Sequence, residues 1–225
     1  SKKTMLTPKK LYKVLENSGL SCIMLAITCA GAGMIISVIN YTGLGLGIAT
    51  IVSRFSGGFL LPALILIMIT CILMGLGMPC TPAYIITVVI GAPAMNALGI
   101  KTLPAHLFVF YFAILAELTP PDAIVAYCAA SIAGSDPWKT GWEASFLGIM
   151  GYIIPFVFVY NRAIILEGPI YASIATSIVL FIVVMLNSAA VTDYFLKPLG
   201  LVKRILLWVI SAALVVFSCQ EKLLA

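Results

Sequence analysis

Apolar runs of membrane-spanning length recur along this chain and decide its fold class. Long stretches without a charged residue cover residues 19–39, 59–77, 80–98, 145–160, 170–190 and 205–219. A helix that crosses a bilayer needs about 20 apolar residues in succession, and 62% of the chain is hydrophobic while only 9% is charged. A transmembrane β-barrel would alternate in segments of about 10 residues, whereas these runs are continuous. We therefore predict an all-α, polytopic transmembrane protein.

Two apolar stretches are interrupted by closely spaced prolines, where a helix in lipid cannot simply continue. The first interruption is GLGMPCTPAY, residues 75–84, and the second is ELTPPD, residues 117–122. Proline has no N–H, and its ring clashes with the carbonyl four residues before it. In lipid an unsatisfied backbone group is costly, so irregular backbone survives only where protein or a watery cavity covers it. We expect interrupted helices or re-entrant hairpins at both places.

Each interruption is predicted to leave helix ends that can bind ions. The end of one arm offers free carbonyls that suit a cation, and the start of the next offers free N–H groups that suit an anion. Paired interruptions of this kind point to the substrate and ion site of secondary transporters. Proline kinks that only shape helix packing are the alternative. The cation-binding candidates are Gly75, Met78, Thr81, Ala116, Glu117 and Thr119, and the substrate-site candidates are Gly77, Pro79, Cys80, Pro120, Pro121 and Asp122.

Two acidic residues flank the second interruption, and acidic groups at membrane depth are functional hypotheses by default. Glu117 could coordinate a cation, pair with an arginine elsewhere or face a watery vestibule. Asp122 is expected in the first turn of the second arm, where the helix dipole favours a carboxylate, and that position alone could explain it. The only histidine, His106, follows a proline-containing loop and is interpreted as interfacial and not catalytic.

The basic residues indicate contact with membrane lipid and not with nucleic acid. The net charge is +5, but the lysines crowd the N-terminus and form no basic stripe interleaved with aromatic residues. Residues 7–18 are expected to form a short amphipathic helix, capped by Thr7, in the membrane interface or as a solvated linker. Gly31 and Gly33 are expected to allow close helix packing, and residues 135–143 to form an interfacial loop.

No motif in the chain indicates an enzyme. The single histidine excludes a zinc-binding H-E-x-x-H motif, and neither a G-x-S-x-G nucleophile turn nor a glycine-rich phosphate loop occurs. The six cysteines lack C-x-x-C spacing and are interpreted as small buried hydrophobic residues. We expect no enzymatic activity, no cofactor and no structural metal.

The order and spacing of the motifs resemble a known family. After GLGMPCTPAY come Gly91-Ala-Pro-Ala94, Glu117-Leu-Thr-Pro-Pro121, Lys139-Thr-Gly-Trp142 and a segment from Gly151 to Asn161. This series resembles the large membrane subunit of tripartite ATP-independent periplasmic (TRAP) transporters over about residues 5–170. The most similar subgroup is that of the fused permeases that work with TAXI-type binding proteins.

The resemblance implies a permease component of a sodium-coupled elevator transporter in the bacterial or archaeal cytoplasmic (inner) membrane. Such a permease has two inverted repeats and takes up a small organic anion, here a carboxylate, from a periplasmic binding protein. The chain resembles the C-terminal repeat, so its partners would include the N-terminal half of the permease and a small membrane subunit. The alternative is a non-transporting membrane scaffold or assembly subunit.

On this basis residues 1–18 would be a polar N-terminus with the interfacial helix, residues 19–160 the transport repeat and residues 161–225 the C-terminal membrane helices. Two residues depart from the family pattern. Cys80 stands where the family commonly has threonine, which removes a hard oxygen ligand. Asp122 stands where the family commonly has a small or apolar residue, which adds a negative charge where an anionic substrate would approach.

Overall fold

The structure is a computed structural model, and it describes residues 7–57, 59–195 and 197–219. The described residues are mostly helical, and their two strands pair as a small antiparallel hairpin, β1 (Tyr194–Phe195) with β2 (Lys197–Pro198). The helices are α1 (Pro8–Thr42), α2 (Leu44–Phe55), α3 (Leu60–Gly75), α4 (Cys80–Ala97), α5 (Thr102–Leu115), α6 (Ile124–Ala133), α7 (Pro137–Leu147), α8 (Ile149–Tyr160), the 3-10 helix η2 (Arg162–Ile165), α9 (Ile170–Thr192) and α10 (Leu201–Ser218).

Both proline-containing segments are unwound, as their sequences predict. The first leaves residues 76–79 outside helices α3 and α4, and the second leaves residues 116–123 outside α5 and α6. Pro82 does not add a break, because it lies in the first turn of α4, where backbone N–H groups have no partner within the helix. Its missing N–H leaves the carbonyl of Met78, four residues earlier and outside the helix, without a hydrogen-bond donor among the described residues.

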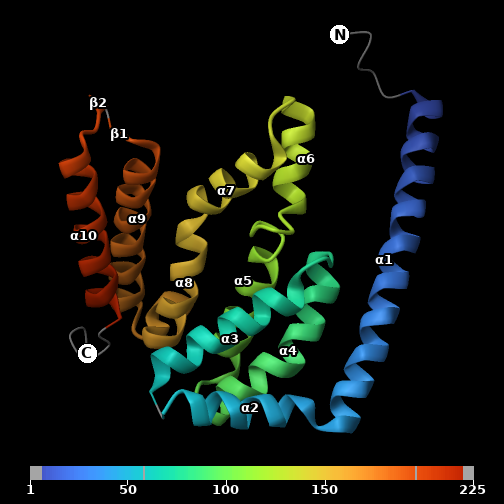
Figure 1. Cartoon of the computed structure of the whole chain (residues 1–225), viewed down its shortest axis with the longest axis horizontal. Helices are drawn as coiled ribbons and strands as arrows, with labels where there is room; N and C mark the ends of the chain where they lie inside the picture. The colour runs from blue at the N-terminus through green and yellow to red at the C-terminus, as the bar shows by residue number, and fades with distance from the viewer. Residues whose placement is uncertain (1–6, 58, 196, 220–225) are drawn as a thin grey trace.

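The two interruptions have different topologies. In Figure 1, α3 starts beside α2 at the lower end of the view, turns at mid-height and returns as α4 to the same end. Helix α5 starts at this lower end, and after the second interruption α6 continues to the opposite end. The 16 residues of α3 extend about 24 Å, less than the roughly 30 Å of a hydrocarbon core. The first interruption is thus the tip of a helical hairpin, and the second lies within an element that continues in one direction.

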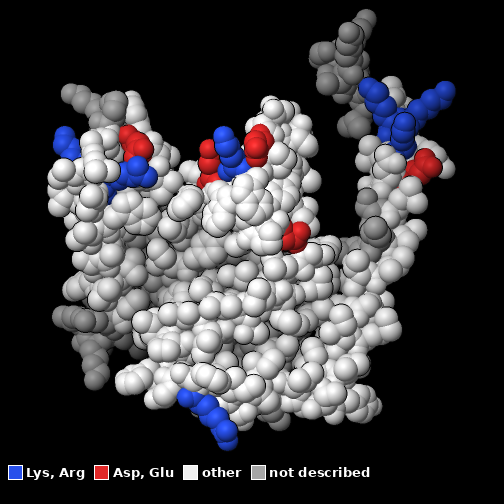
Figure 2. All heavy atoms as spheres, in the orientation of Figure 1, with Lys and Arg blue, Asp and Glu red and all other residues white. Residues whose placement is uncertain are grey.

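Four helical segments of the described residues are long and apolar enough to cross a membrane: Cys80–Ala97, Pro137–Tyr160, Ile170–Thr192 and Leu201–Ser218. Figure 2 shows charged side chains mainly over the end of the molecule where α1 and α7 begin, while the middle of the visible face is almost uncharged. The arrangement confirms an all-α polytopic membrane protein. It also shows that a helix of sufficient length, α4, belongs to a hairpin.

Three local expectations differ from the structure. The short helix expected over residues 7–18 does not end there, because α1 begins at Pro8 after the N-cap Thr7 and continues for 35 residues. The interfacial loop expected over residues 135–143 is largely helical, since Asp136 caps α7 by accepting a hydrogen bond from the backbone N–H of Lys139 at 3.0 Å. A side chain at Gly31 or Gly33 would meet no atom within 4 Å, so neither glycine serves close packing in this chain.

The core lies where the hairpin packs against α5 and α8. Its largest fully buried side chains include Leu64, Ile67, Met95, Phe108 and Phe112. Phe108 and Phe112 each make edge-to-face contacts with Phe156 of α8, with ring centroids 5.4 and 5.9 Å apart. These contacts hold the hairpin, α5 and α8 together as the body that carries both interruptions.

A proline inside α4 also shapes the packing of α2. Pro93 lies within the helix and cannot donate to the carbonyl of Val89, four residues earlier. Gly45 of α2 lies against that carbonyl, because a Cβ on Gly45 would be 3.0 Å from the oxygen. The glycine therefore lets the backbone of α2 cover a carbonyl that the α4 helix does not use.

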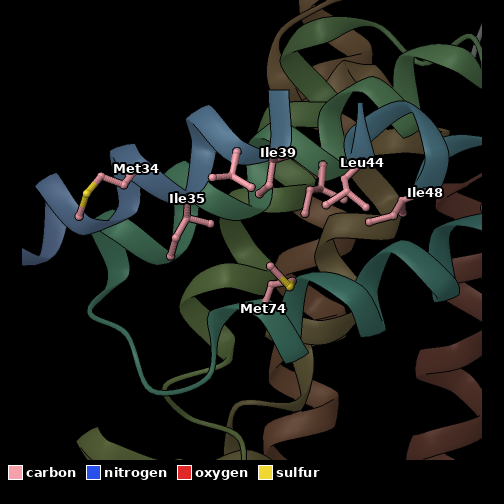
Figure 3. Close-up of a pocket in the computed structure, with 8 residues that line it drawn as sticks. Met34, Ile35, Ile39, Leu44, Ile48 and Met74 are labelled. Carbon is pink, nitrogen blue, oxygen red and sulfur yellow. The ribbon is translucent and has the colours of Figure 1, made fainter. Parts of the chain in front are cut away.

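Helix α1 contacts the rest of the molecule mainly through its second half. Ala32 and Ile39 are buried there against Ile86 and Ile90 of α4. Next to this contact, an apolar groove of about 470 Å³ is lined by side chains from α1, α2, α3 and α4, among them Met34, Ile35, Ile39, Leu44, Ile48 and Met74 (Figure 3). The groove has no polar lining atoms that would indicate a specific ligand.

The C-terminal helices pair through buried polar side chains. The Asn187 amide donates to the Ser211 hydroxyl across α9 and α10, and to the carbonyl of Val183 at 2.9 Å. At the other end of the pair, the Asn161 amide donates to the carbonyl of Ser218 at 2.8 Å. Such hydrogen bonds between helices add specificity in lipid, where apolar surfaces have no preference for each other.

Replacing two glycines by alanine tests which of them serve packing. A Cβ on Gly91 of α4 would lie 2.6 Å from Cγ2 of the buried Val109 and 3.3 Å from the Cys71 sulfur. Since valine is restricted at χ1, Gly91→Ala should lower the stability by about 1–3 kcal/mol. Gly33→Ala, in open space on α1, should be neutral or stabilise by up to about 1 kcal/mol. Thermal unfolding in detergent would measure both, and equal effects would contradict the assigned packing.

Candidate functional site

The two interruptions meet, although 45 residues separate the residues in contact. The backbone N–H of Gly77, at the hairpin tip, donates a hydrogen bond to the carboxylate of Asp122. Cys80, the first residue of α4, lies close to the carboxyl group of Glu117, at the other end of the second interruption. The structure therefore places four of the predicted site residues at one junction.

Close backbone approach makes this junction possible. A Cβ on Gly75 would lie 2.9 Å from Cβ of Ala116 and 3.2 Å from the carbonyl oxygen of Ala113, so only glycine fits there. Two residues later, Gly77 has φ +76°, a left-handed conformation that glycine adopts without strain. Together these glycines let α3 end against α5 and let the chain reverse into α4.

Four helix ends converge on the junction. Helices α3 and α5 end there, and helices α4 and α6 begin there. The last turn of α5 already uses part of its carbonyls, since those of Ile114 and Leu115 accept from the N–H groups of Glu117 and Leu118. The partial charges of helix ends favour cations near the ends of α3 and α5 and anions near the starts of α4 and α6. The sequence analysis predicted such pairs of ends within each interruption, and the fold brings the two pairs together.

Much of the backbone of the second interruption is satisfied by short-range hydrogen bonds. The carbonyl of Ala116 accepts from the N–H of Thr119 at 3.3 Å, and the carbonyl of Thr119 accepts from the N–H of Asp122 at 3.2 Å. Pro120 cannot donate to the Ala116 carbonyl four residues before it, but that carbonyl already has one partner. The peptide bond between Pro120 and Pro121 is cis.

Hydroxyl groups from the following helices cover the same segment, and sequence analysis did not single them out. The Ser145 hydroxyl donates to the carbonyl of Leu118, and the Tyr127 hydroxyl to the carbonyl of Pro121, both at 2.8 Å. The Tyr152 hydroxyl lies 2.6 Å from Oγ1 of Thr119. These three hydroxyl groups supply hydrogen bonds to the unwound segment that water would supply outside a membrane.

A pattern of small residues could have identified the face that carries two of these hydroxyls. Gly141, Ser145, Gly148 and Gly151 recur at intervals of four and three residues through α7 and α8. A Cβ on Gly141 would lie 3.5 Å from Cγ of Pro120, and one on Gly148 would lie 2.7 Å from Cδ2 of Leu118. Helical spacing of small residues is a signal for close helix contact in membranes.

The predicted cation-binding residues differ in burial and in hydrogen bonding. The Thr119 hydroxyl donates to the carbonyl of Leu115 at 2.6 Å and contacts Tyr152, which leaves its oxygen one lone pair. Oε1 of Glu117 is buried and has no hydrogen-bond partner among the described residues. Thr81 is exposed in the first turn of α4, and Met78 is half-buried at the hairpin tip. Gly75 lies in the packing contact with Ala116.

The predicted substrate-site residues come from both interruptions. Pro79 is the N-cap of α4, and Gly77, Pro79 and Cys80 are exposed. Pro120 is half-buried and Pro121 exposed. We expected Asp122 in the first turn of α6, but that helix begins only at Ile124, so Asp122 lies before it. Its carboxylate binds the hairpin tip instead of the dipole of its own helix.

His106 has a structural partner. Its Nδ1 lies 2.9 Å from the hydroxyl of Tyr84, which links the first part of α5 to α4. The Tyr84 ring also packs edge-to-face on Phe110, with centroids 5.4 Å apart. These contacts assign the histidine to the packing between α4 and α5.

The Thr119–Tyr152 contact can be tested by a double-mutant cycle in stability. Thr119→Val and Tyr152→Phe each remove one hydroxyl with little change in shape, and each should destabilise by about 1 kcal/mol. The double variant should lose less than the sum, with a coupling of roughly 0.5–1.5 kcal/mol. Unfolding in detergent measures all three variants, and additive losses would show that the two hydroxyls do not interact.

The chain matches a protein family over most of its length. Residues 2–173 match the family described as the tripartite ATP-independent periplasmic transporter, DctM component. The matched region runs from before α1 into α9 and includes both interruptions. No curated protein and no solved structure matched the chain. The chain therefore belongs to the DctM family, the large permease component of TRAP transporters.

Proposed function

We propose that the chain forms half of the transport site of a sodium-coupled secondary transporter that takes up a small organic anion. The observation that carries this proposal is the meeting of two helix interruptions at one junction inside an otherwise apolar bundle. Broken helices at the middle of the membrane are how secondary transporters expose backbone groups to ions and substrates. The substrate we propose is a small carboxylate delivered by a periplasmic binding protein.

Oxygen atoms at the junction support a cation site. The carbonyls of Leu76, Gly77 and Met78 accept no hydrogen bond from the described residues. In the second interruption the same holds for the carbonyls of Glu117 and Pro120. Unwound carbonyls and the C-terminal ends of half-helices are the groups that coordinate sodium in transporters of this kind. We propose that sodium binds among these oxygens, with Thr119 and Glu117 as side-chain ligands.

The start of α4 supports an anion site beside them. Cys80 and Thr81 are the first residues of α4, and their N–H groups have no carbonyl partner within the helix. A substrate carboxylate can accept from such groups, and the helix dipole favours its charge. We propose that Gly77, Pro79, Cys80, Pro120, Pro121 and Asp122 line the substrate side of the junction.

We propose that other chains complete the site. The hairpin tip is exposed at Gly77, Pro79, Cys80 and Thr81, which leaves one side of the junction open. TRAP permeases work with a periplasmic binding protein and further membrane components, and we propose the N-terminal half of the permease and a small membrane subunit as the partners here. The site would then lie in a cytoplasmic membrane, with lipid around the outer helices.

Uptake in proteoliposomes tests the proposal. With the partner subunits and the binding protein supplied, uptake should depend on an inward sodium gradient. Thr119→Ala removes a side-chain oxygen at the junction and should raise the sodium concentration for half-maximal uptake by about tenfold. Thr81→Ala should also alter the sodium dependence, whereas Thr50→Ala, on the exposed face of α2, should leave it unchanged.

The outcomes separate the site from the function. If Thr119→Ala and Thr81→Ala both leave uptake and its sodium dependence unchanged, these residues are not ligands. If no combination of partners supports uptake by the wild-type chain, the chain is instead a membrane scaffold or assembly subunit.

A further inference from the structure

The contact between Asp122 and Gly77 joins two groups that have no other hydrogen-bond or ion-pair partner among the described residues. Gly77 follows the last residue of α3 and precedes the first of α4, so its N–H belongs to neither helix. The carboxylate of Asp122 forms no ion pair with a described lysine or arginine. Gly77 is exposed and Asp122 half-buried, and a backbone N–H and a carboxylate each gain from a partner there. Each therefore satisfies the other.

We propose that Asp122 is a positioning residue that holds the tip of the α3–α4 hairpin against the α5–α6 interruption through the Gly77 amide. A hydrogen bond to a charged acceptor is stronger than one between neutral groups. Between the two interruptions, Gly75 also packs on Ala116, and Cys80 lies close to Glu117. Asp122 supplies the only backbone hydrogen bond between the two interruptions that the described residues show.

The backbone conformations of Gly77 and Asp122 bring the Asp122 carboxylate to the Gly77 N–H. Gly77 is in the left-handed conformation, and a Cβ there would lie 3.8 Å from Oδ2 of Asp122. Asp122 is held in turn by its own backbone, since its N–H donates to the carbonyl of Thr119 at 3.2 Å and its carbonyl accepts from Ile124 at 2.7 Å. The carboxylate is thus fixed on the α5–α6 side and reaches across to the hairpin.

Two variants separate the hydrogen bond from the charge. Asp122→Asn retains a side-chain oxygen that can accept from the Gly77 N–H but removes the charge. Asp122→Ala removes both. If the residue acts as an acceptor, the asparagine variant keeps the tip in place and the alanine variant releases it. If only its charge matters, the two variants behave alike.

Amide hydrogen exchange of the full chain in detergent or nanodiscs measures the tip directly and requires no substrate. We expect deuterium uptake in a peptide covering residues 73–83 to be at least about tenfold faster for one amide in Asp122→Ala than in wild type. Asp122→Asn should stay close to wild type. Glu143→Ala, which removes an exposed acidic side chain on α7, should change nothing in this peptide. Peptides from α9 and α10 should be unaffected in every variant and report intact folding.

The exchange result decides the proposal whether or not the chain transports. Unchanged exchange at the tip in a folded Asp122→Ala protein, or equal acceleration in the asparagine and alanine variants, would overturn it. If the alanine variant does not fold, Asp122→Leu keeps the volume and still lacks an acceptor, so the same comparison applies. Where wild-type uptake is measurable, Asp122→Ala should lower its maximal rate at least about tenfold. Absent uptake in wild type would count against the proposed function alone.

Discussion

The requirement that every backbone N–H and carbonyl in lipid finds a partner governs this structure. The prolines interrupt two helices and leave backbone groups there without partners inside a helix. The fold places the two interruptions against each other, and the Gly77 N–H is paired there with the carboxylate of Asp122. Ser145 and Tyr127 supply hydroxyl groups to further carbonyls of the second interruption. Among the described residues of the junction, a small set of carbonyls and one carboxylate oxygen of Glu117 remain unpaired. These are the groups that we propose bind ligands.

Small residues set how closely these segments can approach. Gly75 lets the end of α3 lie on the backbone of α5, and Gly141 and Gly148 bring α7 against the second interruption. In lipid, where apolar surfaces gain little by leaving the solvent, such contact supplies the van der Waals attraction that joins helices. The same closeness brings the hydroxyls of Ser145 and Tyr152 within hydrogen-bond distance of their partners. Packing and hydrogen bonding at the site thus depend on the same glycines.

Cys80 and Asp122, which the sequence analysis expected to depart from the family pattern, both lie where the two interruptions approach each other. Cys80 lies close to Glu117, and Asp122 accepts a hydrogen bond from Gly77. The hairpin contributes one of these residues and the α5–α6 segment the other, so each has a neighbour on the opposite segment. We propose that both residues help to hold the hairpin tip in place.

The sequence by itself determined the membrane class, the positions of most apolar helices and the two places where helices had to unwind, because hydrophobic length and proline chemistry act locally. It also singled out Glu117, Thr119 and Asp122 as candidates. It did not show that α3 and α4 form a hairpin while α5 and α6 continue in one direction, since an apolar arm has the same composition in both cases. Nor did it show the pairing of Asp122 with Gly77 or of Tyr152 with Thr119. Those contacts join residues far apart in the chain, and only the packing of glycines against neighbouring helices decides which of them meet.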